Sequence, residues 1–148
     1  MTGATQKVPM KETTGFALAK ACRAHRASVG AALAPMGLHV GQEMFLLELW
    51  REDGLKMGEL AGRLRVEPPT VTRMLQRLEN CGLVERRRDT DDARGIRVYL
   101  TEKGRALEGP VTGCWDGVEA RTFGGMSEEE KRVLRGLLDR IRANLDAV

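Results

Sequence analysis

Short polar and basic side chains recur within residues 69–77, at positions that one face of a helix would share. An arginine can donate two parallel hydrogen bonds to guanine O6 and N7, and a glutamine can bond adenine or a phosphate. Threonine suits phosphate contacts and methyl packing. These residue types indicate DNA contact, although the same residues would also serve as the solvated face of an amphipathic helix. The candidate DNA-binding residues here are Pro69, Thr70, Thr72, Arg73, Gln76 and Arg77.

A second group of arginines surrounds a cluster of aspartates in residues 86–97. Three aspartates offset most of the charge of its five arginines, so it is not a plain basic patch. A hairpin tip can nonetheless insert one arginine into a narrow minor groove, where the potential is most negative. Arg86 and Arg88 are further candidates for DNA contact; alternatively, they solubilise the edge of a strand. We expect Asp92 to orient an arginine rather than to face the phosphates, which would repel it.

The segment that carries the first group is predicted to be a helix. Its apolar positions are spaced three and four apart, which places them on one face. Those positions are Val71, Met74, Leu75 and Leu78. Pro68 and Pro69 come first, and proline costs little in the first helical turn because its φ is fixed and its N–H is not needed there. Gly82 stands where a left-handed residue would end the helix, with Leu83 making the hydrophobic contact.

A hairpin is predicted after this helix. One strand begins at residues 83–84, and residues 96–100 alternate between apolar and polar in the pattern of a half-buried strand. The residues between the strands are rich in turn formers. A shorter amphipathic helix at residues 57–64 comes earlier. A short helix, a turn, a second helix and a two-stranded hairpin make a winged helix-turn-helix over about residues 42–101.

Further helices flank this unit. Residues 14–33 are rich in alanine and predict a long helix. Residues 102–147 predict more helix, with a kink near Pro110 and a capping box that begins at Ser127. Long helices with one apolar face usually bury it against a second copy, so residues 13–36 and 102–147 are predicted to form a homodimer. The fold class is mainly α with a small β-wing, flanked by N- and C-terminal dimerisation helices.

The composition limits the classes of protein that need to be considered. The chain has 148 residues, of which 30% are charged, and a net charge of only +3. We expect a single domain at residues 13–148 after a flexible tail at residues 1–12. The start of the chain has no apolar segment typical of a signal peptide, and no apolar run reaches the ~18 residues of a membrane helix. We therefore expect a cytoplasmic protein without a membrane partner.

The run from residue 60 to residue 104 resembles the MarR family of bacterial transcriptional regulators, and the likeness extends over roughly residues 15–145. The TVTRML helix opening, the LExxGLVER bridge, the DxDDAR tip and the closing LTEKG come in family order and spacing. The resemblance implies a homodimer that binds pseudo-palindromic promoter DNA, often as a repressor released by a phenolic or aromatic ligand or by an oxidant. It also implies that Arg94 enters the minor groove; Ala93 stands where family wings often carry a second basic residue.

The resemblance places an effector pocket between the dimerisation helices and the winged unit. The candidate residues are His25, Met36, His39, Gln42, Met44 and Trp50. A histidine there could bond an acidic ligand, or it could cap a helix. The family's redox-sensing branch suggests Cys22 as a sensor, but its tyrosine partners are absent, since Tyr99 lies in the wing. Cys22, like Cys81, is therefore interpreted as a small hydrophobic residue.

No set of residues predicts catalysis. The sequence shows no motif that pairs a serine or cysteine nucleophile with a histidine, no phosphate-binding loop and no paired carboxylates. The chain is therefore not expected to be an enzyme or to hold a cofactor. His25 and His39 form no metal-ligand spacing with a cysteine or carboxylate. The remaining alternative to a DNA-binding regulator is a winged-helix module that binds proteins.

Overall fold

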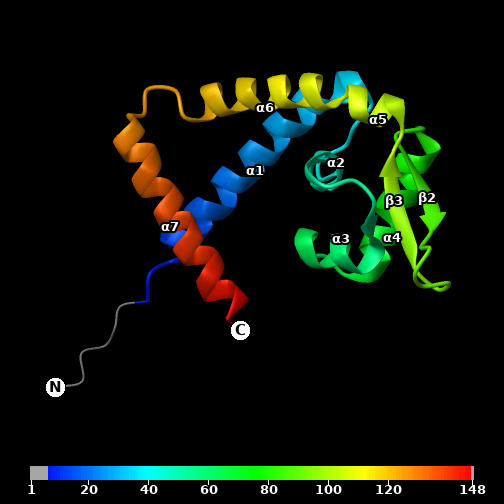
Figure 1. Ribbon diagram of the computed structural model, residues 1–148. Coiled ribbons are helices and arrows are strands. Elements are labelled where there is room, and N and C mark those ends of the chain that lie inside the picture. Colours follow the sequence, from blue (N-terminus) through cyan, green and yellow to red (C-terminus); the bar gives the residue numbers. More distant parts are fainter. Residues whose placement is uncertain (1–6, 148) are drawn as a thin grey trace.

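The computed structural model describes residues 7–147 (Figure 1). It is mostly helical with a small antiparallel sheet, which confirms the predicted fold class. The helices are α1 (Thr14–Leu33), α2 (Gln42–Arg51), α3 (Met57–Leu64), α4 (Pro68–Asn80), α5 (Glu102–Ala106), α6 (Glu108–Thr122) and α7 (Glu128–Asp146). The strands are β1 (Leu55–Lys56), β2 (Val84–Arg88) and β3 (Ile96–Leu100). Two single 3-10 turns, η1 (Met10–Glu12) and η2 (Ala34–Met36), flank α1.

The sheet has one strand more than the sequence predicted. Its order is β1-β3-β2, and the predicted hairpin pairs Val84 with Leu100 and Arg88 with Ile96. The additional strand, β1, pairs Leu55 with Val98. A two-residue strand has no periodicity of its own, and its partner lies more than forty residues away in the sequence. The predicted two-stranded hairpin is therefore present, and β1 adds a third strand that the sequence did not predict.

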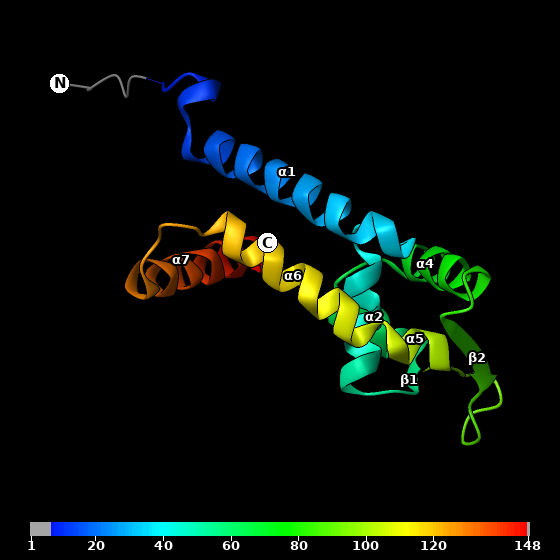
Figure 2. The same ribbon diagram turned by 90° about the horizontal axis from the view of Figure 1, so that it is seen from above.

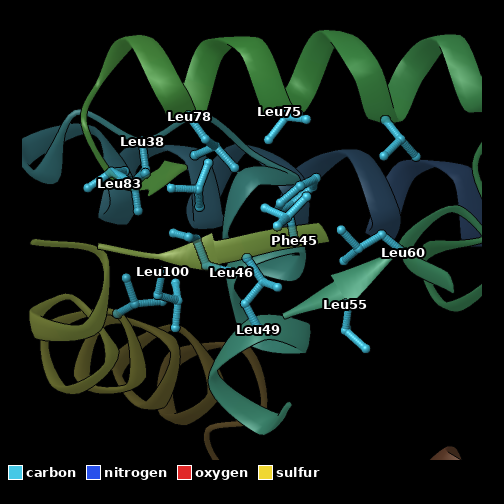
Figure 3. Packing of buried hydrophobic residues seen from close by; sticks show 14 of the residues in the cluster. Leu38, Phe45, Leu46, Leu49, Leu55, Leu60, Leu75, Leu78, Leu83 and Leu100 are labelled. Carbon is cyan, nitrogen blue, oxygen red and sulfur yellow. The ribbon is translucent and has the colours of Figure 1, made fainter. Parts of the chain in front are cut away.

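The hydrophobic core lies between α2, α4 and the sheet (Figure 3). Leucines dominate it, and every labelled side chain is at most 7% exposed. The labelled residues are Leu38, Phe45, Leu46, Leu49, Leu55, Leu60, Leu75, Leu78, Leu83 and Leu100. Burial of a leucine or phenylalanine contributes about 1.5–3 kcal/mol, so this cluster fixes α4 firmly on one side and leaves its other side free.

Both ends of α4 form as the sequence predicted. Glu67 is extended at φ −67° and ψ 146°, and Pro68 and Pro69 occupy the first turn. At the other end Gly82 is left-handed, with φ +73°. The N–H of Leu83 donates to the carbonyl of Leu78 at 3.0 Å, which closes the helix and directs the chain into β2.

The helix after β3 breaks at Leu107, close to Pro110, near which a kink was expected. Pro110 lies in the first turn of α6, where its missing N–H costs little. In a continuous helix the Pro110 ring would clash with the carbonyl of Ala106, four residues earlier. The break therefore lies upstream of the proline and produces two helices, α5 and α6.

The long helices extend away from the winged unit. Figure 2 shows α1 and α6 leaving it on the same side, and α7 follows from the far end of α6. The Ser127 capping box that starts α7 is present, with Glu130 Oε1 accepting the Ser127 N–H at 3.0 Å. None of the helices between residues 7 and 147 combines the length and apolar character that crossing a membrane requires. Half of the tail predicted at residues 1–12 lies outside the described residues; Met10–Glu12 form a 3-10 turn.

Candidate nucleic-acid interface

One face of α4 does not pack against the core, and this face carries the DNA-binding candidates that were predicted from the sequence. Val71, Leu75 and Leu78 are buried on the opposite face. Thr70 is half-buried at the edge between the two faces. The exposed candidates are Pro69, Thr72, Arg73, Gln76 and Arg77. The helix therefore presents donors and acceptors at its N-terminal half, which is the part that a recognition helix inserts into the major groove.

Two contacts arrange the first turn of α4. The Thr72 hydroxyl donates to the Pro68 carbonyl at 3.1 Å, and the Arg73 Nη2 lies 3.5 Å from the Thr70 hydroxyl. The Thr70 contact is long for a hydrogen bond, so it restrains the Arg73 guanidinium weakly. Arg73 is thus free to turn toward a base edge.

The arginines of β2 and β3 are not equivalent. Arg86 Nε donates to Glu79 Oε1 and Oε2 at 3.0 and 3.1 Å, and this hydrogen bonding raises the pKa of Arg86. Arg87 is paired with Glu85 and lies over the Tyr99 ring, 4.3 Å from its centroid. Arg86, one of the candidate DNA-binding residues, therefore connects the end of α4 to the wing in the single chain.

Arg88 and Arg94 are the exposed arginines of the wing that remain available. Within residues 7–147, neither guanidinium has a carboxylate oxygen within 4.0 Å. The hairpin tip that carries Arg94 projects on the side of the molecule that also holds α3 and α4 (Figure 1). A single DNA duplex could therefore meet α4 and the tip together.

The wing tip is organised by aspartates in a way that the sequence did not indicate. Asp92 Oδ1 accepts the backbone N–H of Arg94 at 3.0 Å, so Asp92 shapes the turn and does not hold a guanidinium. The carboxylate that holds one belongs to Asp89, which accepts Arg97 Nε at 3.2 Å. The burial of Asp89 depends on contacts with β1 and β3, so the local sequence pattern does not reveal it.

The predicted effector residues do not form one pocket. His39, Gln42 and Met44 line a cleft of about 370 Å³ between α1, α2 and α4. His25 lines a neighbouring cleft of about 290 Å³, and Trp50 a third of about 270 Å³ beside α6. Met44 borders all three. Met36 packs against the hydrophobic core instead.

Two of these effector candidates have structural partners. Gln42 is buried, and its Oε1 accepts the N–H of His39 at 2.8 Å, so it holds the turn that leads into α2. Trp50 Nε1 donates to the Gly104 carbonyl at 3.0 Å, which ties α2 to α5. His39 itself stays exposed.

Glu43 is a residue that the sequence analysis missed. It is only 5% exposed, and its Oε2 accepts the Gly41 N–H at 2.8 Å. Burial raises the pKa of Glu43, against the lowering effect of its hydrogen bonds and of Arg26. A glutamate in the first turn of a helix normally serves as a solvated partner of the helix dipole, so the sequence contained no sign of its burial.

The cysteines differ from their predicted environments. Cys22 and Cys81 are exposed, so their interpretation as small buried residues was wrong for the single chain. Cys114 is half-buried, and its Sγ lies 3.4 Å from the Ala32 carbonyl. In residues 7–147, no three histidine, cysteine or acidic side chains are grouped so that they could hold a metal ion.

Comparisons with known proteins agree with this geometry. The MarR family model matches residues 39–96. The HTH-type transcriptional regulator TtmR of Methylorubrum extorquens is 37% identical over 132 residues, which cover 89% of this chain and 67% of TtmR.

Solved structures show the same likeness. A MarR transcriptional regulator from Methanosarcina mazei is 30% identical, with a TM-score of 0.79, covering 90% of this chain and 97% of that one. The Staphylococcus aureus MepR–DNA complex is 25% identical, with a TM-score of 0.83, covering 89% and 98%. The similarity extends well beyond the winged unit, into the helices that flank it.

Proposed function

Because the chain belongs to the MarR family, whose members are DNA-binding transcriptional regulators and not enzymes, we propose that it is a repressor that binds pseudo-palindromic promoter DNA as a homodimer. The observation that carries the proposal is the pairing of two free surfaces on one side of the molecule. These are the exposed face of α4 and the wing, where Arg88 and Arg94 have no carboxylate partner in the part of the chain that the structure describes. Proteins that read DNA in this way place a helix in the major groove and a wing beside it.

The roles of the residues follow from their positions. Arg73 reads a guanine through O6 and N7, and Gln76 reads an adjacent base or phosphate. Thr70, Thr72 and Arg77 contact the phosphate backbone, which sets the register of the helix. Arg94 enters the minor groove, where a narrow groove concentrates negative potential.

The homodimer is supported by apolar surface that the single chain leaves exposed. Val133, Leu137, Leu138 and Leu145 on α7 are 41–69% exposed. Such a stripe on a long helix is normally buried against another chain. Two-fold symmetry would place two α4 helices in successive major grooves, about 34 Å apart along the duplex.

The effector is proposed to be a small aromatic acid. The cleft of about 370 Å³ carries Arg26, His39 and Arg77 together with Met44 and Met74, which suits a carboxylate attached to an apolar ring. Thr70 also lines this cleft, so an occupant would press directly on the start of α4. The cleft beside α6 has Glu43 and Asp116 in its wall and would repel an anion.

DNA binding is tested by titrating fluorescent duplexes from the region upstream of the chain's own gene, with a base-scrambled duplex as the control. We expect at least a 100-fold preference for one upstream site, protected as two half-sites in footprinting, and a dimer in sedimentation. Equal affinity for the scrambled duplex at all salt concentrations would refute sequence-specific regulation. No affinity for either duplex would favour a protein-binding module.

The effector is tested separately, by thermal shift and DNA release with hydroxybenzoic acids. Arg26→Ala should abolish the response to the ligand without changing DNA affinity in its absence. An equal response of Arg26→Ala and the unaltered chain would remove this cleft as the site.

A redox input remains a second candidate because Cys22 is exposed in the single chain. DNA affinity before and after peroxide treatment decides it. Loss of binding that is equal in the unaltered chain and in Cys22→Ser would exclude Cys22 as the sensor.

A further inference from the structure

An ionic cluster around one buried carboxylate lies where the wing joins the rest of the winged unit. This wing-base cluster consists of Lys56, Asp89 and Arg97. The Asp89 side chain is 0% exposed, and the residue directly follows the last residue of β2. A buried carboxylate is unfavourable unless hydrogen bonds and opposite charges replace the water that it loses. Its partners must therefore hold defined positions.

Each oxygen of Asp89 has its own cationic partner. Oδ1 accepts the N–H of Asp91 at 3.1 Å and Nε of Arg97 at 3.2 Å, while Nζ of Lys56 lies 3.4 Å from Oδ2. Among the described residues Oδ2 has no hydrogen bond within normal geometry, so the ion pair with Lys56 is its main compensation. The hydrogen bond from Asp91, aided by Arg97 and Lys56, lowers the pKa of Asp89, which is therefore ionised at neutral pH.

The cluster joins segments that are distant in the sequence. Lys56 belongs to β1 and immediately precedes α3, the first helix of the helix-turn-helix. Arg97 belongs to β3, and its Nη1 donates to the Gly54 carbonyl at 2.9 Å. Asp89 begins the tip. One carboxylate thus connects the base of the tip to the strand that leads into α3.

The tip that carries Arg94 is closed by the same residue. The N–H of Asp89 donates to the Gly95 carbonyl at 2.9 Å, and the N–H of Gly95 donates to the Asp92 carbonyl at 2.9 Å. Lys56 and Arg94 line one cleft of about 410 Å³ between the start of α3 and the tip. A displacement of Asp89 would therefore redirect Arg94 relative to the helix-turn-helix.

We propose that Asp89 is a positioning residue for DNA binding: through Lys56 and Arg97 it holds the wing in the orientation in which Arg94 reaches the minor groove while α4 occupies the major groove. The inference rests on the proposed function of the chain as a DNA-binding regulator. Asp89 acts through its partners and does not touch DNA, because it is buried and negatively charged. The side chains of Lys56 and Arg97, 44% and 30% exposed, keep the cluster positive toward the phosphates.

The chain offers a matched pair of variants. Asp89→Asn and Asp91→Asn each remove one negative charge from the tip, but the Asp91 side chain is exposed. If charge alone governs binding, both variants bind operator DNA equally or more tightly. If Asp89 positions the wing, Asp89→Asn loses about tenfold in affinity, whereas Asp91→Asn stays within threefold of the unaltered chain. Circular dichroism and sedimentation confirm that both variants remain folded and keep the same assembly.

Coupling to Arg94 separates positioning from a general loss of stability. In an Arg94→Ala background, Asp89→Asn should reduce operator affinity less than twofold, because the minor-groove contact that Asp89 positions is already absent. Guanine-N7 methylation protection in the major groove should persist in Asp89→Asn, while hydroxyl-radical protection at the flanking minor grooves is lost. A full tenfold loss in the Arg94→Ala background, or equal affinities of Asp89→Asn and Asp91→Asn, would overturn the proposal.

Arg97→Lys supplies a second variant that keeps the charge and covers the case in which Asp89→Asn does not fold. It removes the hydrogen bond to Gly54 and should reproduce the Arg94-dependent loss of DNA affinity with an unchanged salt dependence. Unaltered affinity contradicts the inference.

Hydrogen exchange of the free protein gives a readout without DNA. Amides of residues 89–95 should exchange at least tenfold faster in Asp89→Asn than in Asp91→Asn, and equal exchange refutes the positioning role. If the unaltered chain binds no DNA, the proposed function fails, and exchange still decides whether Asp89 orders the wing.

Discussion

At the scale of single residues, the arginines near the DNA-facing side divide into bound and free groups. Arg86, Arg87 and Arg97 are held by Glu79, Glu85 and Asp89 respectively. An arginine that already has a carboxylate partner has its charge offset and some of its five N–H donors engaged, so we expect it to add less to DNA affinity than an arginine without such a partner. Among residues 7–147, the arginines on this side without a carboxylate oxygen within 4.0 Å are Arg73, Arg77, Arg88 and Arg94. We therefore expect fewer arginines to contact DNA than the sequence contains near this side of the molecule.

Arg73 and Arg94 are predicted to act differently on DNA affinity. Arg73→Ala should cost roughly 1–3 kcal/mol on the operator and relax the preference at one base pair, because it removes a bidentate guanine contact. Arg94→Ala should weaken binding to all sequences and reduce the slope of log affinity against log salt by about one. Salt-titrated anisotropy on operator and single-substitution duplexes measures both effects. Arg86→Ala is the matched control, and an effect as large as that of Arg94→Ala would contradict the division.

Glu43 predicts a pH dependence of stability. Its pKa is raised in the folded chain because burial disfavours the charged form, so the folded state binds the proton more tightly than the unfolded state does. Below the usual pKa of 4.5 the Glu43 carboxyl is protonated in both states and does not destabilise the fold. As the pH rises through the raised pKa, the buried carboxyl becomes charged and the free energy of unfolding falls. Glu43→Gln keeps an acceptor for the Gly41 N–H and should be the more stable form at pH 7, with the advantage vanishing near pH 4. Thermal unfolding at fixed protein concentration tests this; an advantage independent of pH would refute it.

At the scale of elements, α4 is defined by its two ends and by one buried face. Pro68 and Pro69 fix the start, and Gly82 fixes the end. Each of these devices acts locally, which explains why the sequence located the helix correctly. The break near Pro110 also follows from a local rule, because a proline excludes a continuous helix through the carbonyl four residues before it.

Gly82→Ala should destabilise the chain by about 1 kcal/mol or more, because its φ of +73° is costly for any residue with a Cβ. A Cβ at this position would meet no atom within 4 Å, so the cost is conformational and not steric. Gly62 in α3 is the matched control, since a Cβ there also meets nothing and its φ is negative. Gly62→Ala should be neutral or stabilising by about 0.5–1 kcal/mol. Chemical denaturation measures both, and equal effects would contradict the role of the left-handed turn.

At the scale of the whole molecule, the winged unit has its own core while the long helices leave apolar surface open. The exposed stripe on α7 is continuous through Val133, Leu137 and Leu138. Burying it in a homodimer would supply the two-fold symmetry that a pseudo-palindromic operator requires.

Leu137→Glu is expected to weaken the homodimer at least tenfold and to reduce operator affinity with it, because a charge would be buried at the interface. Ala143→Glu introduces the same charge on the opposite face of α7 and should leave both properties unchanged. Sedimentation equilibrium and anisotropy on full and half operators provide the measurements. A dimer of unchanged affinity in Leu137→Glu would show that α7 does not form the interface.

The sequence by itself determined the helices, the hairpin, the exposed face of α4 and the family. These features depend on periodicity, on prolines and glycines at helix ends, and on short motifs, all of which act between residues close in the chain. Only the tertiary structure showed that β1 completes the sheet, that Glu79 forms a salt bridge with Arg86, and that Asp89 is buried beside Lys56 and Arg97. Burial and ion pairing arise from contacts between distant segments, so the availability of a charged side chain for DNA is decided only when the chain has folded.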